Sequence, residues 1–237
     1  MKGIIFYTDS RIGEPTKSMV QNCILESGLP IVSVSLKPLE FGRNFVVEGK
    51  RSYLTMLEQI LVALKNSTSK YVFFCEHDVL YPKSHFDFMP PKDNIFYYNK
   101  NVWRWWIYYD HAIKYDKMLP LSCLCTNREF ALNHYLLRKQ KMEEWGLDRL
   151  RSREPRLVRT WGYEPGTKKI RQGGLTNDDF DTWSSEYPVI DLRHKNTLSN
   201  PKVDLKDFKH QPTGWQEIKI SEIPGWDLKS LFNFYNQ

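Results

Sequence analysis

Apolar runs alternate with amphipathic segments over the first 90 residues of the chain. Residues 3–7, 31–36 and 71–75 are short apolar or β-branched runs of the kind that form buried strands. Between them, residues 16–26 and 52–64 repeat apolar side chains at helical spacing. The run 71–75 is apolar at every position, which predicts a strand covered on both faces. The alternation predicts an α/β fold built on a doubly wound, mostly parallel sheet.

The pattern changes after the Pro90-Pro91 pair, where aromatic residues become frequent and the periodicity is weaker. Several short runs still have the composition of strands, and one segment has the spacing of a helix. The elements expected in this half are a helix over 127–137 and strands over 95–98, 103–109, 121–125 and 189–192.

Two further segments have the composition of surface structure. Residues 138–160 mix many arginines and lysines with acids, which predicts an exposed helix and loop. Residues 162–179 are rich in glycine and charge, which predicts a loop at an active site. We expect one main domain over residues 1–200, with a first half over 1–90 and a second half over 91–200. Residues 201–237 are expected to form a C-terminal extension that packs on this domain.

Composition and charge narrow the function classes only a little. The 237 residues include 34 basic and 28 acidic side chains, a net charge of +6 that permits a polyanionic partner without requiring one. Aromatic residues make up 14%, which suits a surface that stacks on sugars or bases but also a large core. Charge alone therefore does not identify a partner.

Cysteine usage and hydropathy bear on the compartment. The four cysteines have neither the number nor the spacing of a disulfide framework or a zinc knuckle, which predicts reduced thiols. No apolar run has membrane-spanning length, and no cleavable signal stands at the N-terminus. We expect no transmembrane segment and a cytoplasmic protein.

Polar clusters follow two of the predicted strands. Glu76-His77-Asp78 comes directly after the apolar run 71–75, and Asp9 follows the first strand. Ligands of doubly wound sheets bind beyond the carboxyl ends of the strands, so these side chains are expected to share one crevice. Carboxylates are ligands for Mg²⁺ or Mn²⁺, although an acidic turn at the end of a strand has the same residues.

The segment around this cluster resembles the GT-A class of glycosyltransferases. The resemblance covers residues 3–88, where Gly49-Lys50-Arg51 precedes a helix and the strand 71–75 closes on an Asp-x-Asp-type signature. Glu76 takes the first acidic place of that signature and Asp78 the last. The resemblance implies a GT-A-like, Rossmann-like central sheet flanked by helices, a nucleotide-sugar donor such as a UDP-sugar, and Mn²⁺ or Mg²⁺ as cofactor.

The same resemblance implies roles for residues of the donor half. Asp78 would coordinate the metal, and Glu76 would face the ribose or the metal through water. Thr8 and Asp9 would contact the nucleotide, and Arg51 the uracil or the phosphates. The departure from the family pattern is a glutamate in place of the first aspartate, with a histidine between the acids.

A weaker likeness to the family lies near the last predicted strand. GT-A enzymes often supply a late histidine to the metal or the diphosphate, and His194 has a similar position. Arg193 and Lys195 could hold the phosphates. A surface histidine in a basic turn is the alternative for His194.

An inverting transfer needs a carboxylate that takes the proton of the acceptor hydroxyl. The candidates are Glu164, in the glycine-rich segment, and the pair Asp178 and Asp179. Paired acids at the start of a helix occupy the base position of many inverting GT-A enzymes, which favours the pair. Helix N-capping is the alternative role for it.

Acceptor binding is predicted from aromatic and basic residues, namely Trp103, Arg104, Trp105 and Trp161. The cationic segment 138–159 could follow a phosphate backbone. One candidate acceptor is therefore a hydroxymethylated pyrimidine in DNA, as in phage-type glycosyltransferases, which would place a phage-encoded enzyme in the host cytoplasm. A surface glycan or polysaccharide is the competing acceptor. A non-catalytic nucleic-acid-binding or carbohydrate-binding protein is the alternative of another class.

Overall fold

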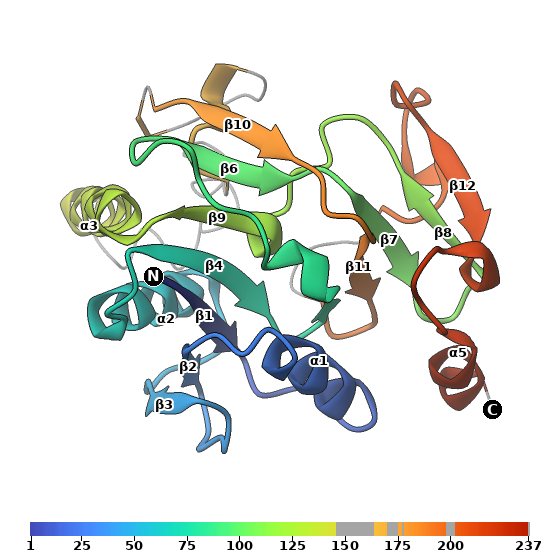
Figure 1. Cartoon of the computed structure of the whole chain (residues 1–237), viewed down its shortest axis with the longest axis horizontal. Coiled ribbons are helices and arrows are strands. Elements are labelled where there is room, and N and C mark those ends of the chain that lie inside the picture. Colours follow the sequence, from blue (N-terminus) through green and yellow to red (C-terminus); the bar gives the residue numbers. More distant parts are fainter. Residues whose placement is uncertain (146–163, 170–174, 177, 198–201, 237) are drawn as a thin grey trace.

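Two β-sheets and four α-helices make up the described part of the computed structural model, which comprises residues 1–145, 164–169, 175–176, 178–197 and 202–236 (Figure 1). The larger sheet has seven strands in the order β10-β6-β9-β4-β1-β2-β3. Their bounds are β1 Lys2–Thr8, β2 Ile31–Ser35, β3 Arg43–Val46, β4 Tyr71–Glu76, β6 Phe96–Asn99, β9 Leu124–Asn127 and β10 Phe180–Trp183.

The direction of the strands confirms the α/β class but not a single, mostly parallel central sheet. In the larger sheet, β1 pairs in parallel with β2 and β4, β2 with β3, and β6 with β10, while β9 is antiparallel to both of its neighbours. The smaller sheet, in the order β12-β8-β7-β11-β5, contains one parallel pair, between β7 and β11. Its strands are β5 Val79–Leu80, β7 Val102–Trp106, β8 His111–Lys114, β11 Val189–Arg193 and β12 Gln216–Lys219.

Three of the described helices cover the larger sheet on both faces, and a fourth lies beside the smaller sheet (Figure 1). They are α1 Thr16–Leu25, α2 Tyr53–Asn66, α3 Arg128–Trp145 and α5 Lys229–Tyr235, with short 3-10 turns at Lys83–His85, Leu121–Cys123, Thr167–Lys169, Leu205–Asp207 and Ile220–Glu222. Helix α2 begins where the Ser52 hydroxyl accepts a 3.1 Å hydrogen bond from the backbone N–H of Thr55, an N-cap that satisfies one of the first free donors.

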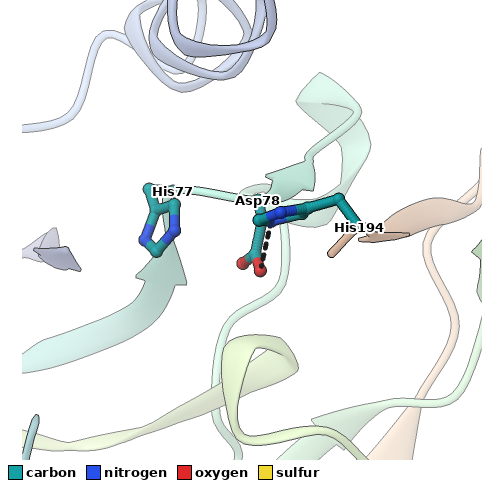
Figure 2. Close-up of side chains that lie close together, drawn as sticks. All are labelled: His77, Asp78 and His194. Carbon is teal, nitrogen blue, oxygen red and sulfur yellow. Dashed lines mark ion pairs between the residues drawn. The ribbon is translucent and has the colours of Figure 1, made fainter. Parts of the chain in front are cut away.

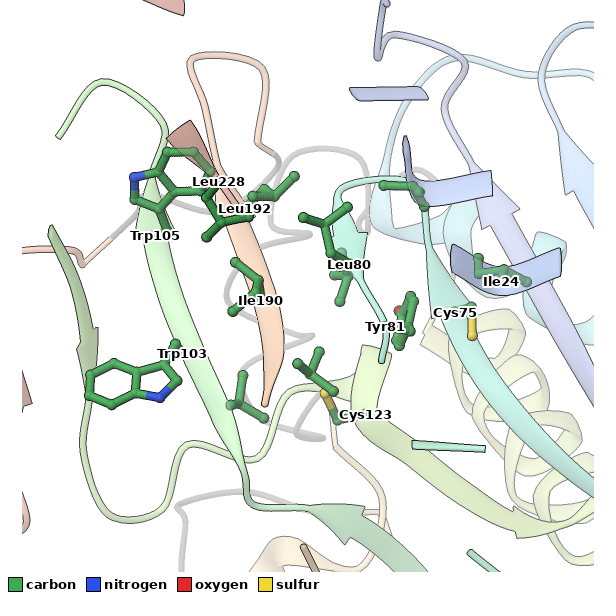
Figure 3. Close-up of a cluster of buried hydrophobic side chains, with 14 of the residues drawn as sticks. Ile24, Cys75, Leu80, Tyr81, Trp103, Trp105, Cys123, Ile190, Leu192 and Leu228 are labelled. Carbon is green, nitrogen blue, oxygen red and sulfur yellow. The ribbon is translucent and has the colours of Figure 1, made fainter. Parts of the chain in front are cut away.

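The alternation of side chains along β1 and β4 creates two cores. Ile5, Tyr7, Val72 and Phe74 face α2 and α3, where buried leucines such as Leu61 meet them. The opposite face packs against α1 and the smaller sheet, with the fully buried side chains of Ile24, Cys75, Tyr81, Trp105 and Ile190 among its members (Figure 3). Both faces of the sheet are thus buried, as the uniformly apolar run 71–75 predicts.

Several boundaries differ from those expected. Strand β3 was not predicted, because its four residues alternate without an apolar face. Strand β7 ends at Trp106, where the N–H of Tyr109 bonds back to the carbonyl of Trp106 in a turn. Helix α3 runs to Trp145, well past the expected end at 137. Residues 121–123, expected as strand, form a 3-10 turn before β9.

The expected exposed character of 138–160 is wrong at its start, because Arg138 is buried on α3 with its Nε donating to His134 Nε2 at 2.9 Å. Residues 146–160 lie outside the described residues. In the part of the chain that is described, none of the helices combines the length and the apolar character needed to cross a bilayer.

Candidate active site

A pocket of about 510 Å³ lies at the carboxyl ends of β1 and β4, beside the start of α2 and the ends of β7 and β11. It lies where ligands of α/β sheets bind, outside the carboxyl edge. The residues predicted for the site that line it are Thr8, Asp9, Arg51, Glu76, Asp78, Arg104, Glu164 and Arg193. The structure therefore brings together side chains from positions 8 to 193 of the chain.

Parallel pairing of β1 and β4 places Tyr7 and Glu76 at the same register position. The Tyr7 hydroxyl donates a 2.7 Å hydrogen bond to Oε1 of Glu76, and the Tyr81 hydroxyl accepts from the Glu76 backbone N–H at 3.0 Å. Burial and the neighbouring Asp78 carboxylate raise the pKa of Glu76 to about 8, although the Tyr7 bond opposes the shift. The side chain of Glu76 is therefore fixed by Tyr7 at the pocket wall.

His77, Asp78 and His194 form a cluster that could hold a metal ion, with one potential ligand atom from each residue within 4.8 Å of the others (Figure 2). His77 and Asp78 lie in the turn that follows β4, and His194 follows the end of β11. The two segments are joined by a 2.9 Å hydrogen bond from the Leu192 N–H to the Asp78 carbonyl. Burial acts to raise the pKa of Asp78, but His77, the His194 hydrogen bond and Arg193 outweigh it, and the pKa falls to about 2. Asp78 is therefore ionised at neutral pH.

This cluster differs from the metal site predicted from the sequence, which consisted of Asp78, Glu76 and His194. His77 takes the place of Glu76, because the Glu76 side chain bonds to Tyr7 while His77 comes after the end of the strand. Two imidazoles and one carboxylate suit Mn²⁺ better than Mg²⁺, which prefers oxygen ligands.

The hydrogen bonds of His194 bear on how it could bind a cation. Its Nδ1 accepts from the backbone N–H of Asn196 at 3.2 Å, so the proton of the neutral ring is assigned to Nε2. Nε2 is buried, and its contact with a described side chain is the one to Oδ2 of Asp78 at 3.5 Å. A buried nitrogen directed at a carboxylate fits a shared cation, which would replace the Nε2 proton.

Asp9 lies next to the cluster and contacts both Arg51 and His77. Its Oδ2 lies 2.5 Å from Arg51 Nε, and its Oδ1 lies 3.6 Å from His77 Nε2. Arg51 also donates to the backbone carbonyl of Asn196. The predicted donor residues Asp9 and Arg51 thus form a pair that is linked to the cluster through His77 and Asn196.

Asp191 is the anchor of two arginines in the pocket wall. It is 2% exposed, and its Oδ2 accepts from Arg104 Nε at 3.0 Å and from Arg193 Nη2 at 2.6 Å. Strand pairing brings these groups together, because Asp191 of β11 is the register partner of Arg104 of β7. Asp191 is a site residue that the sequence analysis missed, since it reads as part of an apolar strand.

The three candidate bases lie in different places. Glu164 lines the pocket, whereas Asp178 and Asp179 are absent from its described lining. Asp178 faces α3, with Oδ2 3.7 Å from Nδ1 of the buried His134, and Asp179 is exposed. The expectation that favoured the aspartate pair is therefore not supported by position.

The predicted tryptophans do not form a stacking surface on the pocket. Trp103 and Trp105 belong to the core at 8% and 0% exposure, and the Trp105 indole donates to the Tyr109 carbonyl at 2.7 Å. The prediction for these two rings is wrong, because successive residues of β7 alternate and Arg104 faces the pocket instead. Trp161 lies outside the described residues. Lys195 is exposed and is not among the described lining residues.

Several lining residues carry no sequence signal that would single them out. Tyr7 lies inside an apolar run, and Tyr115 and Lys117 follow the short strand β8, which was not predicted. His77 stood within the acidic signature but without an assigned role. Gln59 on α2, buried and donating to the Thr8 carbonyl at 2.7 Å, is a polar position in an otherwise apolar helix face, which is a signal that could have found it.

Comparisons with known proteins add little to this geometry. No protein-family model matches the chain, and no curated protein matches it. Among solved structures, the glycosyltransferase GlyE of Streptococcus pneumoniae TIGR4 is similar, with 9% sequence identity and a TM-score of 0.36. The match covers 78% of this chain and 46% of that one, so this chain spans less than half the length of that protein. A likeness at this level carries no conclusion about activity.

Proposed function

We propose that the chain is a metal-dependent glycosyltransferase that moves a sugar from a nucleotide-sugar, such as a UDP-sugar, to an acceptor hydroxyl. The observation that carries the proposal is the cluster of His77, Asp78 and His194 beside a 510 Å³ pocket. The volume fits a nucleotide-sized ligand. The cluster offers a divalent cation an ionised carboxylate and two imidazoles.

The residues on the two sides of the cluster would bind different parts of the donor. Asp9 and Thr8 at the end of β1 would contact the nucleoside, with Arg51 held against Asp9. Arg193, fixed by Asp191, would hold the diphosphate. When bound, a Mn²⁺ or Mg²⁺ ion supplies neutralisation of the negative charge that develops on the diphosphate leaving group.

Glu164 is the carboxylate that we assign as base. In an inverting transfer, the acceptor oxygen bonds to the anomeric carbon, the bond from that carbon to the diphosphate breaks, and the acceptor proton passes to Glu164. Its position in the pocket lining supports this choice over Asp178 and Asp179.

Thermal unfolding with UDP and Mn²⁺ tests the donor site. A ligand that binds the native state raises the melting temperature, so the wild type should gain stability and Asp78→Asn should gain much less. Asp93→Asn is a matched control, because Asp93 is half exposed and bonded to Lys70 and Tyr71 away from the pocket. No shift in a folded wild-type sample would favour the alternative of a non-catalytic binding protein.

The acceptor that we propose is a 5-hydroxymethylpyrimidine in DNA; the net charge of +6 is compatible with such a polyanion but does not select it over a glycan. Incubation of hydroxymethylated DNA with UDP-glucose and Mn²⁺, followed by mass spectrometry of the nucleosides, should give a glycosylated base. Failure with all common donors, alongside transfer to a polysaccharide, would replace this acceptor with a surface glycan.

A further inference from the structure

The pocket extends beyond the His77–Asp78–His194 cluster along the smaller sheet. Val79, Asp191 and Arg104 are register partners across the adjacent strands β5, β11 and β7. Neighbouring strands lie about 4.8 Å apart, so the Arg104 backbone lies about 10 Å from that of Val79, the residue after Asp78. Arg104 and Arg193 bond to the same Asp191 oxygen, so Arg104 lies next to the arginine assigned to the donor diphosphate, on the side of β11 away from β5.

The Arg104 side chain is held rigidly at the pocket wall. Its Nε donates to Asp191 Oδ2 at 3.0 Å, and its Nη1 donates to the Tyr115 hydroxyl at 3.3 Å and to the Lys202 carbonyl at 3.5 Å. Nη2 makes no hydrogen bond to any of the described residues. A fixed guanidinium with one nitrogen left open on a pocket is suited to an oxyanion.

The charge at this end of the pocket also favours an anion. Asp191 bonds to both Arg104 and Arg193 through the same oxygen. Asp78 and Glu76 add negative charge on the Arg193 side, so Arg104 and Lys117 carry the positive charge at this end of the pocket. Lys117 lines the same pocket and has a φ of 63°, a conformation that residues other than glycine adopt rarely and often at functional positions.

The C-terminal segment supports this end from behind. The Tyr115 ring lines the pocket and stacks on Trp215, with centroids 6.4 Å apart and planes 12° apart. Phe208 packs edge-on against both rings. Arg104 and Tyr115 are therefore positioned by residues 202–215, which the donor half does not supply.

We propose that Arg104, with Tyr115 and Lys117, forms an anion subsite that takes a phosphate group of the acceptor, next to the Arg193 side chain that would hold the donor diphosphate. The assignment of this phosphate to the acceptor rests on the proposed function. The preferred acceptors then carry a phosphate near the hydroxyl that receives the sugar, as nucleotides and polynucleotides do.

Phenyl phosphate is the probe for the subsite, with benzyl alcohol as its neutral counterpart. Protein saturated with UDP and Mn²⁺ has its diphosphate site filled, so a further rise in melting temperature on titration with phenyl phosphate reports a second anion site. We expect Arg104→Gln to weaken phenyl phosphate at least tenfold and Arg104→Lys to weaken it less, with the UDP-dependent shift retained in both. An equal phenyl phosphate shift in wild type and Arg104→Gln, or none in wild type, overturns the proposal.

Two further measurements distinguish a failure of the proposed function from a failure of the anion subsite. If UDP and Mn²⁺ give no shift, the proposed function fails, and the phenyl phosphate titration without UDP, compared between wild type and Arg104→Gln, still decides the anion subsite. If the wild type binds UDP-glucuronic acid more tightly than UDP-glucose and Arg104→Gln loses that preference, the donor sugar supplies the anion and the assignment to the acceptor is overturned.

With an active preparation, 5-hydroxymethyldeoxycytidine and its 3′,5′-bisphosphate form a matched pair of acceptors. The bisphosphate should have at least tenfold higher kcat/KM in the wild type, and Arg104→Gln should remove the difference between the two acceptors. Equal use of the two acceptors by the wild type contradicts the proposal.

Discussion

The Tyr7 hydroxyl donates a 2.7 Å hydrogen bond to the Glu76 carboxylate across the parallel pair β1 and β4. Both residues line the pocket, and Tyr7 is 3% exposed. The bond fixes the acidic side chain that was predicted as a metal ligand, and the cluster that could hold a metal includes His77 in its place.

Tyr7→Phe removes the hydroxyl and keeps the ring. A hydrogen bond to a charged or buried carboxyl is worth about 2 kcal/mol, so we expect the free energy of unfolding in urea to fall by about that amount. Tyr71→Phe is the matched control: its hydroxyl bonds to the half-exposed Asp93 at 2.7 Å, and its loss should cost less than about 0.5 kcal/mol. If Tyr7→Phe and Tyr71→Phe lowered the free energy of unfolding equally, the buried Tyr7 bond would stabilise the fold no more than the exposed one.

Mn²⁺ binding should depend on each member of the cluster. Isothermal titration in the presence of UDP should show affinity at least about tenfold weaker in Asp78→Asn and in His194→Ala, because each removes one ligand. His77→Ala should behave in the same way, whereas Glu76→Gln should lose less. His210→Ala, at an exposed histidine, is the control. If Glu76→Gln loses more affinity than His77→Ala, the sequence-based ligand set is the right one.

The pair of Asp9 and Arg51 should control nucleotide affinity. Asp9→Asn removes the charge that holds Arg51 at 2.5 Å, and we expect the Kd for UDP to rise about tenfold, which corresponds to about 1.4 kcal/mol. Fluorescence or calorimetric titration measures it, with Asp93→Asn as control. An unchanged Kd would place the nucleoside elsewhere in the pocket.

Acid should destabilise the fold through His85. Its side chain is fully buried, and burial lowers its pKa from 6.5 to about 3. Between these values the unfolded chain binds a proton that the folded chain does not, so stability is complete above pH 6.5 and declines as the pH falls toward 3. At pH 5 the protonation of His85 in the unfolded chain lowers the free energy of unfolding by about 2 kcal/mol.

Urea unfolding at pH 7.5 and pH 5 measures this loss. His85→Gln, which keeps a group able to bond to Asn99, should reduce the difference between the two pH values by about 2 kcal/mol. The remaining pH dependence includes that of His134, whose pKa burial lowers to about 4. His210→Gln should leave the difference unchanged. A wild-type difference that His85→Gln does not alter would contradict the assignment.

Two glycines with the same backbone conformation make a test of packing. Gly28 and Gly42 have φ values of 66° and 61°, but a Cβ on Gly42 would lie 2.6 Å from the Ile31 carbonyl, while one on Gly28 would meet nothing within 4 Å. Gly28→Ala should cost about 1 kcal/mol from the backbone alone, and Gly42→Ala about 3 kcal/mol, in urea unfolding. Equal costs would show that the chain around Ile31 yields to the added methyl group.

The donor half was predictable because its signals are strong and local. Strand β4 and helix α2 have apolar patterns that leave few alternatives, and their observed bounds differ from the expected ones by one or two residues. Strand β3 carries no such pattern, because it pairs at an edge with partly exposed side chains. The burial of Arg138 on α3 could not be predicted, because the presence of a charged residue in the sequence does not show that its guanidinium packs against His134.

The candidate site was predictable only in its position on the sheet. The end of the strand at Glu76 gave the location of the site. The turn after the strand decides whether Glu76 or His77 joins the cluster, and the conformation of a turn cannot be predicted from a periodic pattern of residues. The choice of Glu164 over Asp178 likewise depends on long-range packing, since Asp178 is drawn to His134 on α3. Trp103 and Arg104 are neighbours in sequence on opposite faces of β7, and the face is set by strand pairing rather than by residue type.

Asn196 joins His194 to Arg51 through its main chain, since its N–H donates to His194 and its carbonyl accepts from Arg51. Neither contact uses the amide side chain. The bridge therefore depends on the path of the backbone and not on the amide side chain, so most substitutions at position 196 should leave it in place. Proline is the exception, because it lacks the N–H that sets the proton on the histidine ring.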